Sequence, residues 1–115
     1  MIVDDDNTSR LLINKFLISI TSKIIYAGTG YGAITICHTN PDINLILMDI
    51  KMPDMKGYDS TLLIREFNKN VVIIAQTTFG FFGDKEITLK NGCNDHIYKP
   101  INKNKLLEQI NKHFK

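Results

Sequence analysis

The sequence predicts an α/β fold in which a doubly wound parallel sheet is covered by helices on both faces. Short apolar runs alternate five times with longer segments of helical periodicity along the 115 residues, which is typical of repeated strand–helix units. Two central runs, Leu45–Met48 and Val71–Ala75, are continuously apolar, as expected of strands that are buried on both faces. The length suits a single domain, residues 1–115, and is far below the about 250 residues of a closed eight-unit barrel.

The predicted strands are short and mostly aliphatic. In chain order they are Met1–Val3, Lys23–Ala27, Leu45–Met48, Val71–Ala75 and His96–Tyr98. The first is unusually short, and the fourth is the most strand-like because it is β-branched and lies between Asn70 and Gln76. Five strand–helix units in a chain of this length predict the flavodoxin-like (βα)5 arrangement, with strand order 2-1-3-4-5.

The predicted helices differ in strength. In chain order they are residues 12–20, Tyr31–His38, Tyr58–Phe67, Phe82–Asn91 and 106–114. The first has apolar residues at helical spacing and Asn7 or Thr8 as its cap, and the last has one apolar face and a cap at Asn102. The second ends near Pro41, the third follows Gly57, and the fourth is marginal because glycines flank it.

Composition excludes several classes of function. The formal net charge of +2 is too small to indicate a nucleic-acid partner. No apolar run approaches the ~20 residues that span a bilayer, and no secretory leader is present, so we expect a cytoplasmic domain without membrane contact. Cys37 and Cys93 do not make a disulfide framework, and Cys93 with His96 lacks the further ligands of a zinc site.

Polar side chains follow four of the predicted strands at the point where each strand ends. Asp4–Asp6 follow the first strand, Asp49 ends the third, Thr77 follows the fourth and Lys99 follows the fifth. In a doubly wound sheet these ends meet at one rim, where ligands bind. Converging carboxylates repel one another, and a divalent cation relieves the repulsion. Oxygen ligands alone favour Mg²⁺ over zinc, and the site therefore suits phosphoryl chemistry on a carboxylate.

These motifs resemble, over essentially the whole chain, the receiver domains of response regulators in two-component systems. Val3–Asp5 is similar to the acidic pair after their first strand, and Leu45–Gly57 to the segment around their phospho-accepting aspartate. Ala75–Thr78 falls where the family has its switch threonine, and Lys99–Ile101 matches the Lys-Pro after the last strand. The four motifs come in the family's order and at its spacings.

The resemblance implies a phosphorylation site and a metal site. Asp49 would accept the phosphoryl group from a phosphohistidine. Asp5 would bind Mg²⁺ directly, with Asp4 assisting directly or through water, and Asp49 and the main-chain carbonyl of Lys51 would complete the protein ligands. No organic cofactor is implied. The partner would be a sensor histidine kinase or a histidine phosphotransfer domain.

The resemblance also implies a switch. Thr77 and Lys99 would hold the phosphoryl oxygens, with Lys99 aimed inward by a cis bond to Pro100. Movement of Thr77 would make room for the ring at position 96 and would change the surface of helix 4, strand 5 and helix 5, a possible dimer contact. The family usually has Tyr or Phe where this chain has His96. Two interpretations stay open: a passive surface ring, which is the default, or a ring that is charged when exposed, which would make the inward rotation pH-dependent. We further expect Phe79 to shield the acyl phosphate from water.

Three alternatives stay open. Gly28–Ala33 fits a dinucleotide-binding fingerprint, with Asp49 about 20 residues on, but it follows the second strand and lies off the switch point. A Mg²⁺-dependent phosphohydrolase with an aspartate nucleophile would usually need a second aspartate at the position of Lys51. The domain could stand alone, belong to a hybrid histidine kinase or precede a transcription factor module; Asp6–Arg10 and the ending shortly after one helix are slightly closer to hybrid-kinase receivers.

Overall fold

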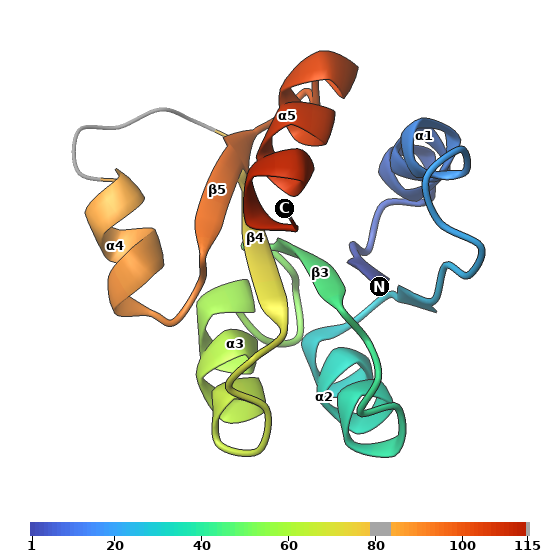
Figure 1. Cartoon of the computed structure of the whole chain (residues 1–115). Coiled ribbons are helices and arrows are strands. Elements are labelled where there is room, and N and C mark those ends of the chain that lie inside the picture. Colours follow the sequence, from blue (N-terminus) through green and yellow to red (C-terminus); the bar gives the residue numbers. More distant parts are fainter. Residues whose placement is uncertain (79–83, 115) are drawn as a thin grey trace.

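The computed structural model describes residues 1–78 and 84–114. It contains one parallel sheet of five strands in the order β2-β1-β3-β4-β5 (Figure 1). The strands are β1 (Ile2–Val3), β2 (Tyr26–Ala27), β3 (Leu45–Asp49), β4 (Val72–Thr77) and β5 (Asp95–Tyr98). The predicted fold class and strand order are confirmed.

Helices cover both faces of this sheet. They are α1 (Asn7–Leu17), α2 (Gly30–Thr39), α3 (Gly57–Arg65), α4 (Asp84–Lys90) and α5 (Lys103–His113). Figure 1 shows α2 and α3 next to one another and well apart from α1 and α5. The Tyr58 hydroxyl of α3 and the Thr88 hydroxyl of α4 are hydrogen-bonded at 2.9 Å, which joins α4 to the layer of α3. Within the described residues no helix has the length and apolar character needed to cross a bilayer.

The sheet separates two apolar cores, because successive strand residues point to opposite faces. One core joins Met48 and Ala75 of the sheet to Ala33 of α2 and Ile64 of α3. The other joins Leu47 and Ile74 to α1 and α5, and includes Leu106. Asp49 has the same parity in β3 as Leu47, so its side chain projects on the α1 and α5 face at the carboxyl end of the strand.

Several element boundaries differ from the predicted ones. The cap of α1 is Asp6, whose carboxylate accepts the Ser9 amide, and not Asn7 or Thr8. β2 contains only two of the residues predicted at 23–27, because β1 offers it only two partners. β4 continues to Thr77, where it pairs with β5. The first residues of the predicted helix at 82–91 lie outside the described part of the chain.

Candidate functional site

Three carboxylates meet at the carboxyl end of the sheet. Asp4 directly follows β1 and is fully buried, and Asp49 ends β3 and is only 3% exposed. Asp5 is exposed, and one carboxylate oxygen from each of the three lies within 4.8 Å of the others. β1 and β3 are neighbours in the sheet, so residues 45 positions apart in the sequence are brought to one place. The structure thus assembles the acidic cluster that the sequence predicts.

Backbone amides hold two of these carboxylates in place. The Asp6 amide donates to Asp4 Oδ1 at 2.9 Å, and the Lys51 amide donates to Asp49 Oδ1 at 3.2 Å. The loop after β3 closes against the strand end, since the Gly57 amide donates to the carbonyl of Ile50 at 3.0 Å. A Cβ at Gly57 would collide with the Asp49 carbonyl oxygen. Glycine therefore lets this loop pack directly against the aspartate.

Lys99 lies between the two buried carboxylates. Its ammonium is 2.8 Å from Asp4 Oδ2 and 3.5 Å from Asp49 Oδ2. It follows β5, and the peptide bond between Lys99 and Pro100 is cis, as expected. Burial alone would lower the pKa of Lys99, but its hydrogen bond to Asp4 and the charges of both aspartates together raise it. The side chain therefore stays a cation beside the cluster.

Asp49 resists ionisation more than an ordinary aspartate. Burial raises its pKa to about 6; the positive charge of Lys99 acts in the opposite direction, and the negative charge of Asp4 adds to the rise. The positive charge of Lys99 alone therefore does not fully offset the burial and mutual repulsion of the carboxylates. A hard divalent cation fits the residues present, because every side-chain donor is a carboxylate oxygen.

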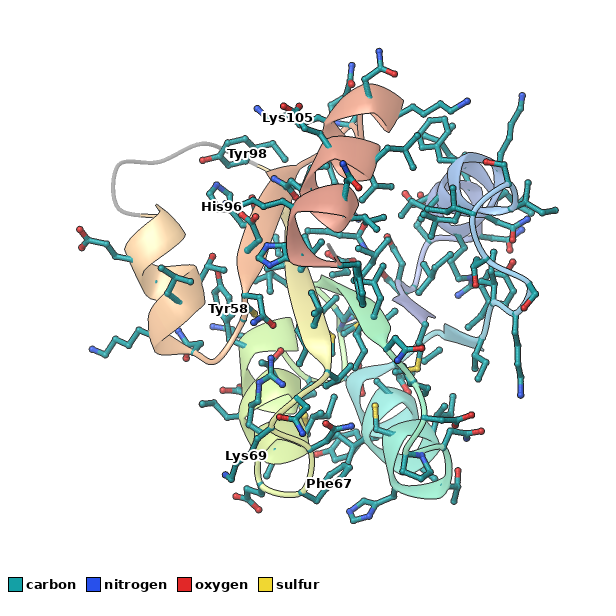
Figure 2. All side chains as sticks on the ribbon, viewed as in Figure 1. Tyr58, Phe67, Lys69, His96, Tyr98 and Lys105 are labelled. Carbon is teal, nitrogen blue, oxygen red and sulfur yellow. The ribbon has the colours of Figure 1, made fainter. Side chains whose placement is uncertain are left out.

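Thr77 and His96 lie on the same face of the sheet. Ala75 pairs with His96 and Thr77 pairs with Tyr98, so all four side chains project toward the side of α2, α3 and α4. In Figure 2 the His96 and Tyr98 side chains lie close together beside β5, and their rings meet edge to face at 4.9 Å. Thr77 Oγ1 and His96 Nδ1 are buried without a hydrogen-bond partner among the described residues. Thr77 and His96, the predicted switch residues, thus each have a buried polar atom that could form a new hydrogen bond.

Two residues near the site were missed by sequence reasoning. Arg10 donates to the Asp4 carbonyl at 2.7 Å, and so helps to fix the strand end. Asp54, in the loop after β3, accepts the amides of Gly30 and Tyr31, each at 3.2 Å. Asp54 therefore occupies the helix N-terminus at which a dinucleotide phosphate would have to bind. Neither contact has a sequence signature, because each depends on the folded loops.

Comparison with known proteins identifies the family. Residues 1–111 match the family model described as the response regulator receiver domain. The chain belongs to this family. The receiver domain is 37% identical to the transcription factor SKN7 of Candida albicans over 98% of this chain and 20% of the relative. It is 31% identical to the sensor histidine kinase GacS of Pseudomonas protegens over 94% of this chain and 12% of the relative. The receiver domain therefore spans a fifth or less of the length of these relatives.

Solved receiver structures have a similar backbone fold. The TM-score is 0.92, with 28% identity, to the crystal structure of the CheX–CheY–BeF3–Mg²⁺ complex from Borrelia burgdorferi. The match covers 99% of this chain and 87% of that chain. The TM-score is 0.88, also with 28% identity, to a co-crystal structure of the histidine phosphotransfer protein Ypd1 and the receiver domain of Ssk1 from Saccharomyces cerevisiae, over 96% of this chain and 84% of that one. These likenesses support the phosphorelay assignment of the receiver domain. Phe79 lies outside the described residues, and its shielding role stays a prediction.

Proposed function

We propose that Asp49 of this receiver domain accepts a phosphoryl group from a phosphohistidine, with Mg²⁺ held by Asp4, Asp5, Asp49 and the carbonyl of Lys51. The observation that carries the proposal is the meeting of three carboxylate oxygens within 4.8 Å beside a lysine ammonium. When bound, Mg²⁺ would supply positive charge to the oxygens of the transferring group.

The residues of this chain have distinct parts in the transfer. A carboxylate oxygen of Asp49 forms the new bond to phosphorus, while the bond from phosphorus to the donor imidazole nitrogen breaks. The imidazole leaves with that bonding pair and takes a proton from solvent. Lys99 neutralises one equatorial oxygen, and the unpartnered hydroxyl of Thr77 donates to another. The products are an aspartyl phosphate and a neutral histidine.

The proposed phosphodonor docks over α1. This helix begins at Asn7, three residues after Asp4. Leu11 and Leu12, in the second turn of α1, are 61% and 39% exposed. Exposed apolar side chains near the start of α1 suit contact with a helical phosphotransfer domain or a kinase. The complex of Ypd1 with the Ssk1 receiver supports a partner of this kind.

The proposed output is a change of surface. The Thr77 hydroxyl moves to the phosphoryl group, and the His96 ring turns toward the space that it leaves, which alters the face of α4, β5 and α5. The domain is proposed to act in the cytoplasm as a signalling element with no other substrate. Its cysteines, Cys37 and Cys93, are free thiols, which suits a reducing compartment.

The test is incubation with Mg²⁺ and phosphoramidate, followed by intact-mass measurement. We expect the mass gain of one phosphoryl group in the wild type and in Asp42→Asn, which removes an exposed carboxylate far from the site. We expect no gain in Asp49→Asn or in the presence of a chelator. Labelling of Asp49→Asn at the wild-type rate would overturn the proposal. Continuous release of phosphate from a generic ester would instead favour the phosphohydrolase alternative.

A further inference from the structure

A carboxylate from the loop after β3 covers the start of α2. Asp54 Oδ1 accepts the Gly30 amide and Asp54 Oδ2 accepts the Tyr31 amide, each at 3.2 Å. Thr29, the N-cap of α2, accepts the Gly32 amide at 2.9 Å. The first three amides of the helix are therefore satisfied, two of them by a residue of another loop. α2 has no acidic residue in its own first turn, so Asp54 supplies the negative charge that stabilises a helix N-terminus.

A glycine at the first position of α2 lets this loop approach the helix closely. A Cβ at Gly30 would collide with the Ser60 hydroxyl of α3 and would lie 3.0 Å from the Met55 Cβ. Met55 directly follows Asp54 in the chain, so the loop packs against the start of α2 as well as bonding to it. The glycine-rich segment Gly28–Ala33, which fits a dinucleotide fingerprint in the sequence, thus receives a loop of the same chain.

The loop that contains Asp54 also carries the carbonyl of Lys51, the proposed main-chain ligand of Mg²⁺. The loop is closed at its base, where the Gly57 amide donates to the Ile50 carbonyl at 3.0 Å. Lys51 is the first residue beyond this closure, and its amide donates to Asp49 Oδ1 at 3.2 Å. Among the described residues the Lys51 carbonyl accepts no hydrogen bond. Its direction therefore depends on how the backbone is held on either side.

The path from Lys51 to Asp54 is short. The two residues between them are Met52, which is buried in the core shared with α2 and α3, and Pro53, whose ring restricts the backbone. Burial of Met52 holds the loop against the core but is not directional. The two hydrogen bonds of Asp54 do have a direction, so they fix how the peptide groups of this path are turned.

We propose that Asp54 is a positioning residue for the Mg²⁺ site: by binding the start of α2, it holds the loop so that the Lys51 carbonyl is oriented for the cation. This role rests on the proposed function, because it concerns the same site. Coupling between two sites is reciprocal. A cation that holds Lys51 in place therefore also strengthens the hydrogen bonds between Asp54 and α2.

The test measures Mg²⁺ affinity by the NMR shift of the Lys51 amide in the wild type and three variants. Asp54→Ala removes both hydrogen bonds to α2. Thr29→Ala removes the other cap of the same helix and leaves the loop intact, and Asp59→Asn removes an exposed charge in the first turn of α3. We expect the Kd for Mg²⁺ to rise about threefold to tenfold in Asp54→Ala, less than the roughly 10–100-fold for partners that bond a metal ligand directly. Both controls should stay within about twofold of the wild type on that scale.

Hydrogen exchange tests the reciprocal effect. In the wild type and in Thr29→Ala, Mg²⁺ should slow exchange of the Gly30 and Tyr31 amides by about the same factor as the affinity change. In Asp54→Ala these amides should exchange faster, and Mg²⁺ should leave their rates unchanged. Loss of helix stability alone would not remove the dependence on Mg²⁺.

Wild-type affinity for Mg²⁺ in Asp54→Ala would refute this role. An equal loss of affinity in Thr29→Ala or in Asp59→Asn would refute it as well, because it would assign the effect to helix stability or to charge. Labelling of Asp49 by phosphoramidate at saturating Mg²⁺ is a separate readout and should persist in Asp54→Ala. A wild type that takes up no label contradicts the proposed function, whereas a labelled wild type with unaltered Asp54→Ala affinity contradicts the positioning role alone.

Discussion

The ammonium of Lys99 lies 2.8 Å from Asp4, although 95 positions separate the two residues in the chain. The same ammonium is 3.5 Å from Asp49, the proposed phosphoacceptor. The segment after β5 thus places a cation beside carboxylates that follow β1 and end β3. The lysine neutralises the aspartates in this structure, and in the proposed transfer it would neutralise the phosphoryl oxygens as well.

Replacing this lysine should slow phosphorylation. In Lys99→Met the stem keeps its volume while the charge is lost, and we expect the rate with phosphoramidate to fall by about 10²-fold, the scale for loss of one charge-stabilising donor. The rate is measured by intact mass over time. Lys103→Met, which changes an exposed lysine at the start of α5, is the control and should keep the wild-type rate. A wild-type rate in Lys99→Met would remove this residue from the mechanism.

The buried carboxylate of Asp49 should lower the stability of the fold in the absence of a cation. Burial and the Asp4 charge both disfavour the Asp49 carboxylate, so Asp49→Asn should raise the free energy of unfolding in a chelator by about 1 kcal/mol after allowance for solvent screening. Urea denaturation with and without Mg²⁺ measures this. Mg²⁺ should stabilise the wild type and Asp42→Asn but have little effect on Asp49→Asn. A destabilised Asp49→Asn would contradict this account.

The switch threonine should contribute little to resting stability. Thr77 Oγ1 is buried without a described partner, so Thr77→Val keeps the shape and should not lower the free energy of unfolding, or should raise it slightly. The same variant should lose the shift of the His96 ring signals that beryllofluoride induces in the wild type, as followed by NMR. Thr78→Val is the matched control. A His96 shift of wild-type size in Thr77→Val would separate the two residues.

The amino group of Met1 should make stability depend on pH. Burial lowers its pKa to about 6 in the folded chain from the ordinary value of 8.0, so between these pH values the unfolded state binds more protons. The free energy of unfolding should therefore rise from pH 6 to pH 8, by at most about 2–3 kcal/mol. Acetylation of the amino group should abolish this rise. The same slope before and after acetylation would assign the dependence to another group.

Arg65 should be important for stability. Its guanidinium donates to the carbonyl of Gly92 at 2.8 Å, to that of Val71 at 2.7 Å and to the side chain of Asn94 at 2.9 Å. It thus joins the end of α3 to the segments that enter β4 and β5. Arg65→Lys keeps the charge but loses the planar guanidinium group, whose separate nitrogens make these three hydrogen bonds. It should lower the free energy of unfolding by about 2 kcal/mol. Lys69→Met, an exposed change in the same turn, should have little effect in the same urea titration.

Sequence reasoning worked where a periodic pattern or a strand-end motif carries the information. The continuous apolar runs that end at Asp49 and near Thr77 predict central strands, and both are strands in the structure. The polar residues at the carboxyl ends of parallel strands then lie close together. Sequence reasoning failed where the length of a strand depends on the neighbouring strand in the sheet. The residues at 23–25 have strand-like composition but lie outside β2, because β1 is too short to pair with them.

Side-chain contacts between distant loops were also beyond prediction. Asp6 caps α1 in place of its neighbours Asn7 and Thr8, and residues of one polar class cannot be ranked for this role without the backbone. From the sequence, Gln76 is recognisable only as the polar residue after the fourth predicted strand. It is buried and donates to the Leu47 carbonyl at 3.2 Å, a contact that appears only once β3 and β4 are paired.

The tie between Asp54 and the start of α2 offers a way to observe the site from a distance. Tyr31 gives its amide to Asp54, while its ring is well exposed. The loop that follows the phosphoacceptor is thus mechanically connected to an aromatic ring on a helix outside the α4, β5 and α5 face. A fluorine label on the Tyr31 ring should therefore report metal and phosphoryl occupancy while leaving the face of α4, β5 and α5 unlabelled.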